Sequence, residues 1–90
     1  MTDRQEVLAL IAKALDEVLD EPAGELTEST GLLSDIGLNS AAVLELLMVV
    51  EDAAGISVDP EDLSIDHLRT MRSFADFVEA AMNRVAEGEK

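Results

Sequence analysis

Apolar residues in the first part of the chain recur every three or four positions. This spacing places them along one face of an α-helix. They are Val7, Leu8, Ile11, Leu15, Val18 and Leu19. The pattern predicts a first helix over about residues 3–19.

The next stretch has no clear period. Pro22 and Gly24 interrupt the helical pattern, and apolar residues are scattered up to Ile36. We expect a long, partly buried loop over residues 20–39. A connection of this length is uncommon in a small domain and is often functional or contains a short helical turn.

The strongest helical pattern covers about residues 40–54, with Leu46, Leu47, Val50 and Ala54 on the expected core side. Gly55 is placed to end this second helix.

Two further helices are predicted in the last third of the chain. Asp59 and Pro60 fit an N-cap and a first helical position, which predicts a short helix over about 60–66. A final helix over about 71–87 opens near Thr70 or Ser73 and ends before Gly88. We therefore expect a single domain, residues 1–90, with an all-α fold: a four-helix bundle with a long first loop and a short third helix.

The composition narrows the class of protein. The 90 residues include two Phe, no Trp or Tyr and no Cys, so the core is aliphatic, and disulfides, thiolate metal sites and a cysteine nucleophile are excluded. The N-terminal residues lack the basic and apolar regions of a secretory signal, and no apolar run is long enough to cross a bilayer. We expect a soluble, cytoplasmic monomer that does not insert into membranes.

The negative charge is unevenly distributed. The net charge is −14, and no Lys or Arg occurs between Ala14 and Leu68. This field repels nucleic acid and anionic membranes and attracts basic protein surfaces. The alternative is that the acidic residues only keep the protein soluble.

Ser40 stands where the second helix is predicted to start, at the end of the run Asp35-Ile36-Gly37-Leu38-Asn39-Ser40. Backbone N–H groups at a helix start lack partners within the helix, so a phosphodiester on Ser40 would lie in a favourable field. Gly37 permits a tight approach to the helix and Asn39 can cap it. The alternative is that Asn39 and Ser40 are caps and nothing more.

The run D-x-G-L-N-S, followed by L-x-L-L-x-x-x-E-x-x-x-G-I from Leu44 to Ile56, resembles the region around the modified serine of the acyl and peptidyl carrier family. The resemblance extends over most of the chain, and the family usually has Asp where this chain has Asn39. It implies that Ser40, with Gly37, Leu38 and Asn39 beside it, carries 4′-phosphopantetheine. The arm comes from coenzyme A through a phosphopantetheinyl transferase, and its thiol holds cargo as a thioester.

One side of the second helix suits reversible docking. Small apolar and acidic residues recur there at helical spacing, and we expect basic surfaces of acyl- or aminoacyl-loading and processing enzymes to bind them. The expected docking residues are Ala41, Leu44, Glu45, Met48, Glu51 and Asp52. The alternative for Leu44 and Met48 is that they belong to the core.

Three functions remain open on the sequence. The first is an acyl carrier for fatty-acid, polyketide or related specialised biosynthesis. The second is an aminoacyl or peptidyl carrier of a nonribosomal pathway, and the third is an unmodified acidic helical interaction module. An enzyme is not expected, because no acid, base and nucleophile set stands out and His67 is the only histidine. We expect no metal site, because the acidic clusters lack the spacing of a calcium loop.

Overall fold

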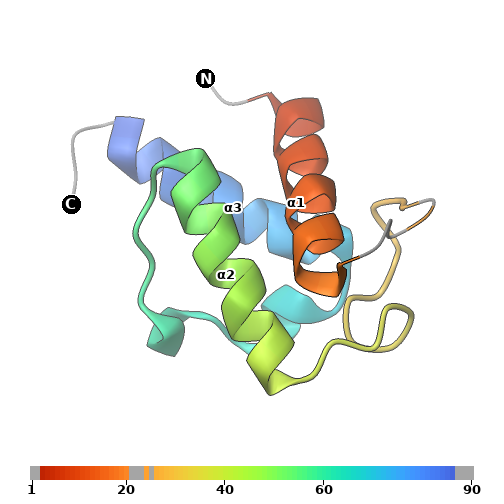
Figure 1. Cartoon of the computed structure of the whole chain (residues 1–90). Coiled ribbons are helices and arrows are strands. Elements are labelled where there is room, and N and C mark those ends of the chain that lie inside the picture. The colour runs from red at the N-terminus through yellow and green to blue at the C-terminus, as the bar shows by residue number, and fades with distance from the viewer. Residues whose placement is uncertain (1–2, 21–23, 25, 87–90) are drawn as a thin grey trace.

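The computed structural model describes residues 3–20, 24 and 26–86, which form three α-helices and two short 3₁₀ segments (Figure 1). In chain order these are α1 (Arg4–Leu19), α2 (Ser40–Ala54), η1 (Pro60–Asp62), η2 (Ile65–Leu68) and α3 (Met71–Ala86). The described residues contain no β-strand, so the predicted all-α class is confirmed. The helices expected at about 3–19, 40–54 and 71–87 correspond to α1, α2 and α3. Residue 87 and Gly88, expected to end the last helix, lie outside the described residues.

The short third helix predicted over about 60–66 is not present as one helix. The structure has two separate 3₁₀ turns there, η1 and η2, instead of one helix. Ser64 between them has an extended backbone, with φ −111° and ψ 168°, and serves as the N-cap of η2. A second helix start only four residues after Pro60 leaves no room for an α-helical turn to propagate.

Local side-chain bonds set where the α-helices begin and end. The Asp3 carboxylate accepts the Gln5 N–H at 3.0 Å at the start of α1. At the start of α3, Thr70 Oγ1 accepts the Ser73 N–H and Ser73 Oγ accepts the Thr70 N–H, both at 3.1 Å. Gly55, at φ 69°, ends α2 in the left-handed conformation that glycine adopts without strain.

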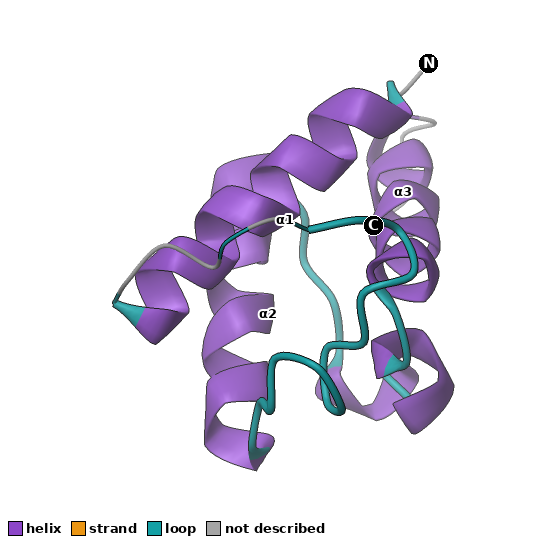
Figure 2. Cartoon of the chain, turned by 90° about the vertical axis from the view of Figure 1, so that its right-hand side faces the viewer, coloured by secondary structure: helices purple, strands orange, loops and turns teal. Residues whose placement is uncertain are grey.

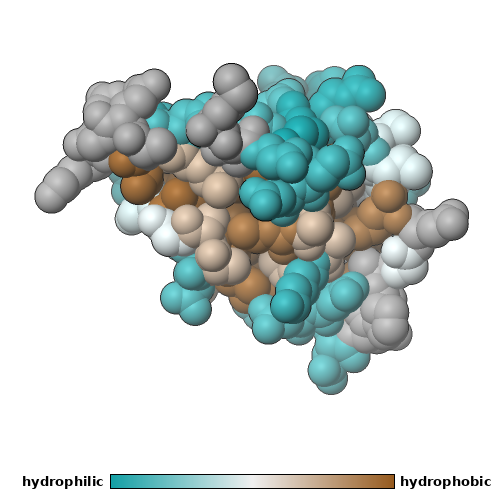
Figure 3. Space-filling view, turned by 90° about the horizontal axis from the view of Figure 1, so that it is seen from above, coloured by the Kyte–Doolittle hydropathy of each residue, from teal (hydrophilic) through white to brown (hydrophobic). Residues whose placement is uncertain are grey.

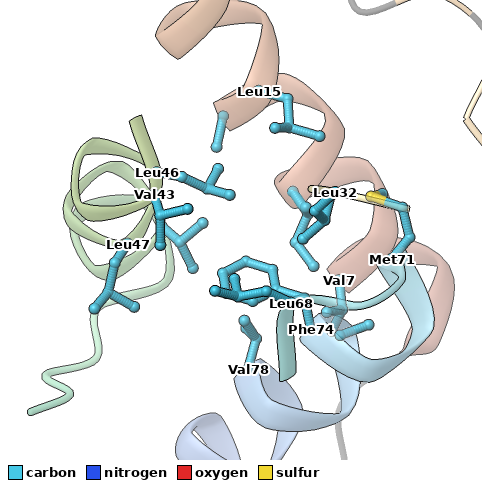
Figure 4. Close-up of a cluster of buried hydrophobic side chains, with 14 of the residues drawn as sticks. Val7, Leu15, Leu32, Val43, Leu46, Leu47, Leu68, Met71, Phe74 and Val78 are labelled. Atoms are coloured by element: carbon cyan, nitrogen blue, oxygen red, sulfur yellow. The ribbon is translucent and has the colours of Figure 1, made fainter. Parts of the chain in front are cut away.

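The core is made by all three helices and by the loop between α1 and α2 (Figure 4). None of the buried residues in the described part of the chain is polar or charged, so the core is held by apolar packing. Its largest fully buried side chains are Val7, Ile11, Leu15, Leu32, Leu46, Val50, Met71, Phe74 and Val78.

The loop between α1 and α2 is fastened to the start of α3, as the path of the loop in Figure 2 shows. The N–H groups of Met71 and Arg72 donate to the carbonyl oxygens of Thr30 and Glu28, at 2.8 and 2.9 Å. These N–H groups belong to the first turn of α3 and have no partner within the helix. The loop therefore supplies acceptors for the first N–H groups of α3, and these bonds hold the loop in place.

Gly31 allows this close approach. It is buried, and a Cβ at this position would overlap the Ser34 hydroxyl and lie 3.2 Å from the Arg69 carbonyl oxygen. The backbone of the loop thus runs directly against the chain that leads into α3.

None of the helices within the described residues is long and apolar enough to cross a membrane.

Arg4 forms ion pairs that link the start of α1 to α3. Its guanidinium pairs with Asp76 and Glu79 of α3; the bond from Nη2 goes to Asp76 Oδ1, and Nε lies 2.9 Å from Glu79 Oε2. The hydrogen bond to Asp76 raises the pKa of the guanidinium above its usual value. One side chain of α1 thereby holds two successive turns of α3.

We expect Arg4→Gln to lower the free energy of unfolding by about 1 kcal/mol, because it removes a small ion-pair network between helices. The difference from the parent protein should shrink in about 1 M salt, which screens such pairs. Urea unfolding at low and high salt measures both effects.

Lys13→Gln is the matched control, since Lys13 is an exposed residue of α1 with no ion pair to another described residue. It changes the net charge equally. Equal destabilisation by the two substitutions would show that net charge, and not the Arg4 ion pairs, is responsible.

Candidate functional site

Ser40 is the first residue of α2, and its side chain is exposed. The loop brings the chain to this point through Leu38, which is buried and whose N–H donates to the Leu32 carbonyl oxygen at 3.2 Å. Just before Leu38, Gly37 has φ 79°, a conformation that costs a side-chain-bearing residue free energy. A Cβ at Gly37 would meet no other atom within 4 Å, so the left-handed backbone, and not the predicted tight approach, is what favours glycine at this position.

Asn39 caps α2 as expected from the sequence. Its Oδ1 accepts the Ala42 N–H at 2.8 Å, and its carbonyl oxygen accepts the Val43 N–H at 2.9 Å. No described residue accepts a hydrogen bond from the N–H groups of Ser40 and Ala41. These two donors, at the positive end of the helix, can bind an anionic oxygen attached to Ser40.

A hollow lies beside Ser40, which we call the Ser40 hollow. Its volume is about 560 Å³, and most of its lining is apolar. Three segments line it: the loop (Leu33, Leu38, Asn39), α2 (Ser40, Val43, Leu44) and the segment around η2 (Leu63, Ser64, Ile65, Leu68). A group attached to Ser40 therefore has an apolar surface within reach.

Sequence reasoning missed the wall of this hollow around η2. Ile65 is 69% exposed although it is a large apolar residue, and Leu63 is half-buried. The sequence does contain a clue: apolar residues occur among the acidic residues of 59–66, although a fully solvated turn would not need them.

The proposed docking residues lie along one side of α2. Ala41, Glu45 and Asp52 are exposed, and so are Leu44 at 49% and Met48 at 66%. Leu44 and Met48 therefore do not belong to the core, which settles the alternative that the sequence left open for them.

Glu51 differs from the other proposed docking residues. It is half-buried, and its Oε2 accepts the Val58 N–H at 2.7 Å. The carboxylate thus holds the extended chain after α2 in place, a role that the sequence did not reveal.

No cation of the described chain neutralises Glu45 or Asp52. The basic residues with ion pairs are Arg4, Arg69 and Arg72, and their partners are Asp76, Glu79, Asp66 and Glu28. The exposed side of α2 therefore keeps its negative charge, as a surface that attracts a basic partner must.

Apolar exposure alone does not single out this side of α2. Figure 3 looks onto the opposite end of the molecule from Ser40 and shows apolar atoms between hydrophilic groups there as well. The combination of apolar and unpaired acidic residues beside Ser40 is what identifies α2 as the candidate docking side.

The Ser40 hydroxyl has no general base next to it. The structure pairs its Oγ with no carboxylate or imidazole of the described residues, and the ring of His67 is bonded to Ser64 instead. The described residues also contain no group of three metal-ligating side chains.

The sequence matches the family described as "Phosphopantetheine attachment site" over residues 5–78. It is 36% identical over 61 residues to an acyl carrier protein of Saccharopolyspora erythraea, covering 68% of this chain and 64% of the relative. It thus spans just under two thirds of that relative's length. An acyl carrier protein of Thermotoga maritima is 27% identical over 88% of this chain and 95% of its own. A meromycolate extension acyl carrier protein of Mycobacterium leprae is 26% identical over 84% of this chain and 64% of its own.

We expect Asn39→Ala to lower the free energy of unfolding by about 1 kcal/mol, because it removes the acceptor of the Ala42 N–H. Asn39→Asp keeps an acceptor and should leave stability unchanged or slightly higher. Thermal or urea unfolding of both variants measures this. Equal stability of Asn39→Ala and the parent protein would contradict the capping role.

Proposed function

This chain belongs to the family of acyl carrier proteins with a phosphopantetheine attachment site, and we propose that Ser40 is the residue that carries the arm. Proteins of this kind are carriers and not enzymes. The observation that supports Ser40 is an exposed hydroxyl on the first residue of α2, beside two unpaired backbone N–H groups and an apolar hollow.

The residues around Ser40 fit a phosphopantetheine group. The Ser40 oxygen would form the phosphodiester, and the N–H groups of Ser40 and Ala41 would donate to its oxygens. Gly37 and Leu38 hold the backbone that presents the serine, and Asn39 satisfies the Ala42 N–H without adding charge. When bound, the arm supplies a thiol that holds an acyl group as a thioester.

The exposed side of α2 would meet the partner enzymes. Glu45 and Asp52 would attract Arg and Lys side chains, while Ala41, Leu44 and Met48 add a small apolar contact. Glu51 would contribute mainly through its charge, because its carboxylate already bonds the Val58 N–H. The partners would be a phosphopantetheinyl transferase and the enzymes that load and process the cargo.

An acyl cargo is favoured over an aminoacyl or peptidyl cargo. The relatives described above are all named as acyl carrier proteins. We propose a role in fatty-acid, polyketide or related specialised biosynthesis, carried out by a monomer in the cytoplasm. An unmodified interaction module is disfavoured, because a module of that kind has no need of an exposed serine beside an apolar hollow.

Incubation with coenzyme A and a promiscuous phosphopantetheinyl transferase should add the mass of one phosphopantetheine group. Ser40→Ala should abolish the addition, and intact-protein mass spectrometry reads the result. Ser57→Ala, which removes another exposed serine, should still be modified. A folded parent protein that stays unmodified, or a Ser40→Ala variant that is modified, would refute the proposal.

Reversal of two charges on α2, in a Glu45→Lys and Asp52→Lys double variant, should lower kcat/KM for this loading reaction by about tenfold. Each of the two exposed charges would contribute up to ~1 kcal/mol to binding of the transferase. Circular dichroism should show that the helices remain.

The matched control is the double variant Glu6→Lys with Asp16→Lys. Both residues are exposed on α1, and the pair again replaces one Glu and one Asp, so the net charge changes equally. If both double variants load equally fast, the docking surface lies elsewhere.

A further inference from the structure

The wall of the Ser40 hollow that faces α2 is a short turn. Ser64, Ile65 and Leu68 line the hollow from η2 and its N-cap. A 3₁₀ segment of four residues has little stability of its own, so its position depends on what it contacts. Those contacts are made mainly with α3.

His67 provides three of the contacts that hold this turn. Its Nδ1 lies 3.0 Å from the backbone nitrogen of Ser64, at the start of η2. Its ring centroid is 4.6 Å from that of Phe77 on α3. Its carbonyl oxygen accepts a hydrogen bond from Ser73 Oγ at 2.9 Å.

The bond to Ser64 defines the form of the imidazole. A backbone N–H can only donate, so Nδ1 must accept, and the ring proton must be on Nε2. In the cationic imidazolium both ring nitrogens carry protons. Protonation would place two donors opposite each other across 3.0 Å and remove the bond.

We propose that His67 is a positioning residue, whose neutral imidazole holds η2 as the wall of the Ser40 hollow and thereby shields a group attached to Ser40. The significance of the shielding rests on the proposed function, whereas the hold of His67 on η2 does not. The sequence analysis assigned His67 no role. Ser64 and His67 form a capping box at the start of η2, but histidine stands there in place of the usual Glu or Gln, and Phe77 lies in a different segment.

The charged groups around His67 are already paired with other residues. Asp66 and Arg69, in and just after η2, pair with each other at 3.1 Å. The residues of α3 that contact His67, Ser73 and Phe77, carry no charge. The charged residues in this part of α3 are Arg72, paired with Glu28, and Asp76 and Glu79, both paired with Arg4.

Two variants separate the hydrogen bond from the packing. His67→Gln keeps an acceptor that does not titrate, and His67→Leu keeps an apolar contact with Phe77 but has no acceptor. In the unmodified protein at constant pH, the Ser64 amide should exchange with deuterium about three- to tenfold faster in His67→Leu than in the parent. His67→Gln should stay close to the parent.

Rescue by His67→Gln is a readout that packing alone would not give, because glutamine restores an acceptor and not the ring contact with Phe77. Equal exchange in all three proteins, or exchange in His67→Gln as fast as in His67→Leu, would overturn the hold of His67 on η2.

The shielding is tested on protein loaded with octanoyl-phosphopantetheine. Hydroxylamine should cleave the thioester at similar rates in the parent and His67→Gln at about pH 8, and about three- to tenfold faster in His67→Leu. Identical rates in all three proteins would overturn the shielding. Failure of Ser40 to load would instead refute the proposed function and leave the amide measurements valid.

Discussion

The burial of Leu32 is the contact on which the position of Ser40 depends. Leu32 has the one large side chain of the described loop between α1 and α2 that is fully inaccessible to solvent, and it packs among side chains of all three α-helices. Its carbonyl oxygen accepts the Leu38 N–H, two residues before Ser40. A long loop has many conformations to lose on folding, and one buried leucine with a few backbone bonds selects the conformation that delivers the serine to the start of α2.

The three α-helices differ in how many of their first backbone N–H groups have an acceptor. This difference leaves donors free beside Ser40. At α1 the Asp3 side chain accepts an N–H, and at α3 the loop carbonyls and the Thr70 and Ser73 side chains accept four. At α2 only the Ala42 N–H has a side-chain acceptor, which leaves the donors of Ser40 and Ala41 open. Unpaired donors are tolerated there because Ser40 and Ala41 are exposed and water can bind them. The same donors suit an anionic ligand.

The sequence predicted what repeats along the chain or lies within a few residues. The ranges of the three α-helices and the cap at Asn39 were readable, because each has a period or a local motif. Contacts between distant segments leave no such pattern, so the bonds of the loop to α3 and the η2 wall of the Ser40 hollow were missed. The Glu51 bond to Val58 is closer in the sequence but belongs to no motif, and it was missed as well. The prediction of one short helix at 60–66 did not allow for a second start. Asp59-Pro60 does begin a turn, but Ser64 begins another before the first can lengthen.

The acidic residues destabilise the folded chain by repelling one another, and the same residues attract a basic partner. The chain carries a net charge of −14, and carboxylates that repel one another destabilise a compact state. Pairing them with internal cations would relieve this, yet the described ion pairs lie on α1, α3, η2 and the loop and leave Glu45 and Asp52 of α2 without one. Stability must then come from the aliphatic core, to which α2 contributes Leu46 and Val50 on its other side. One helix thus packs into the core with one face and keeps an unneutralised acidic face for a basic partner, and binding of that partner would relieve the repulsion that folding leaves in place.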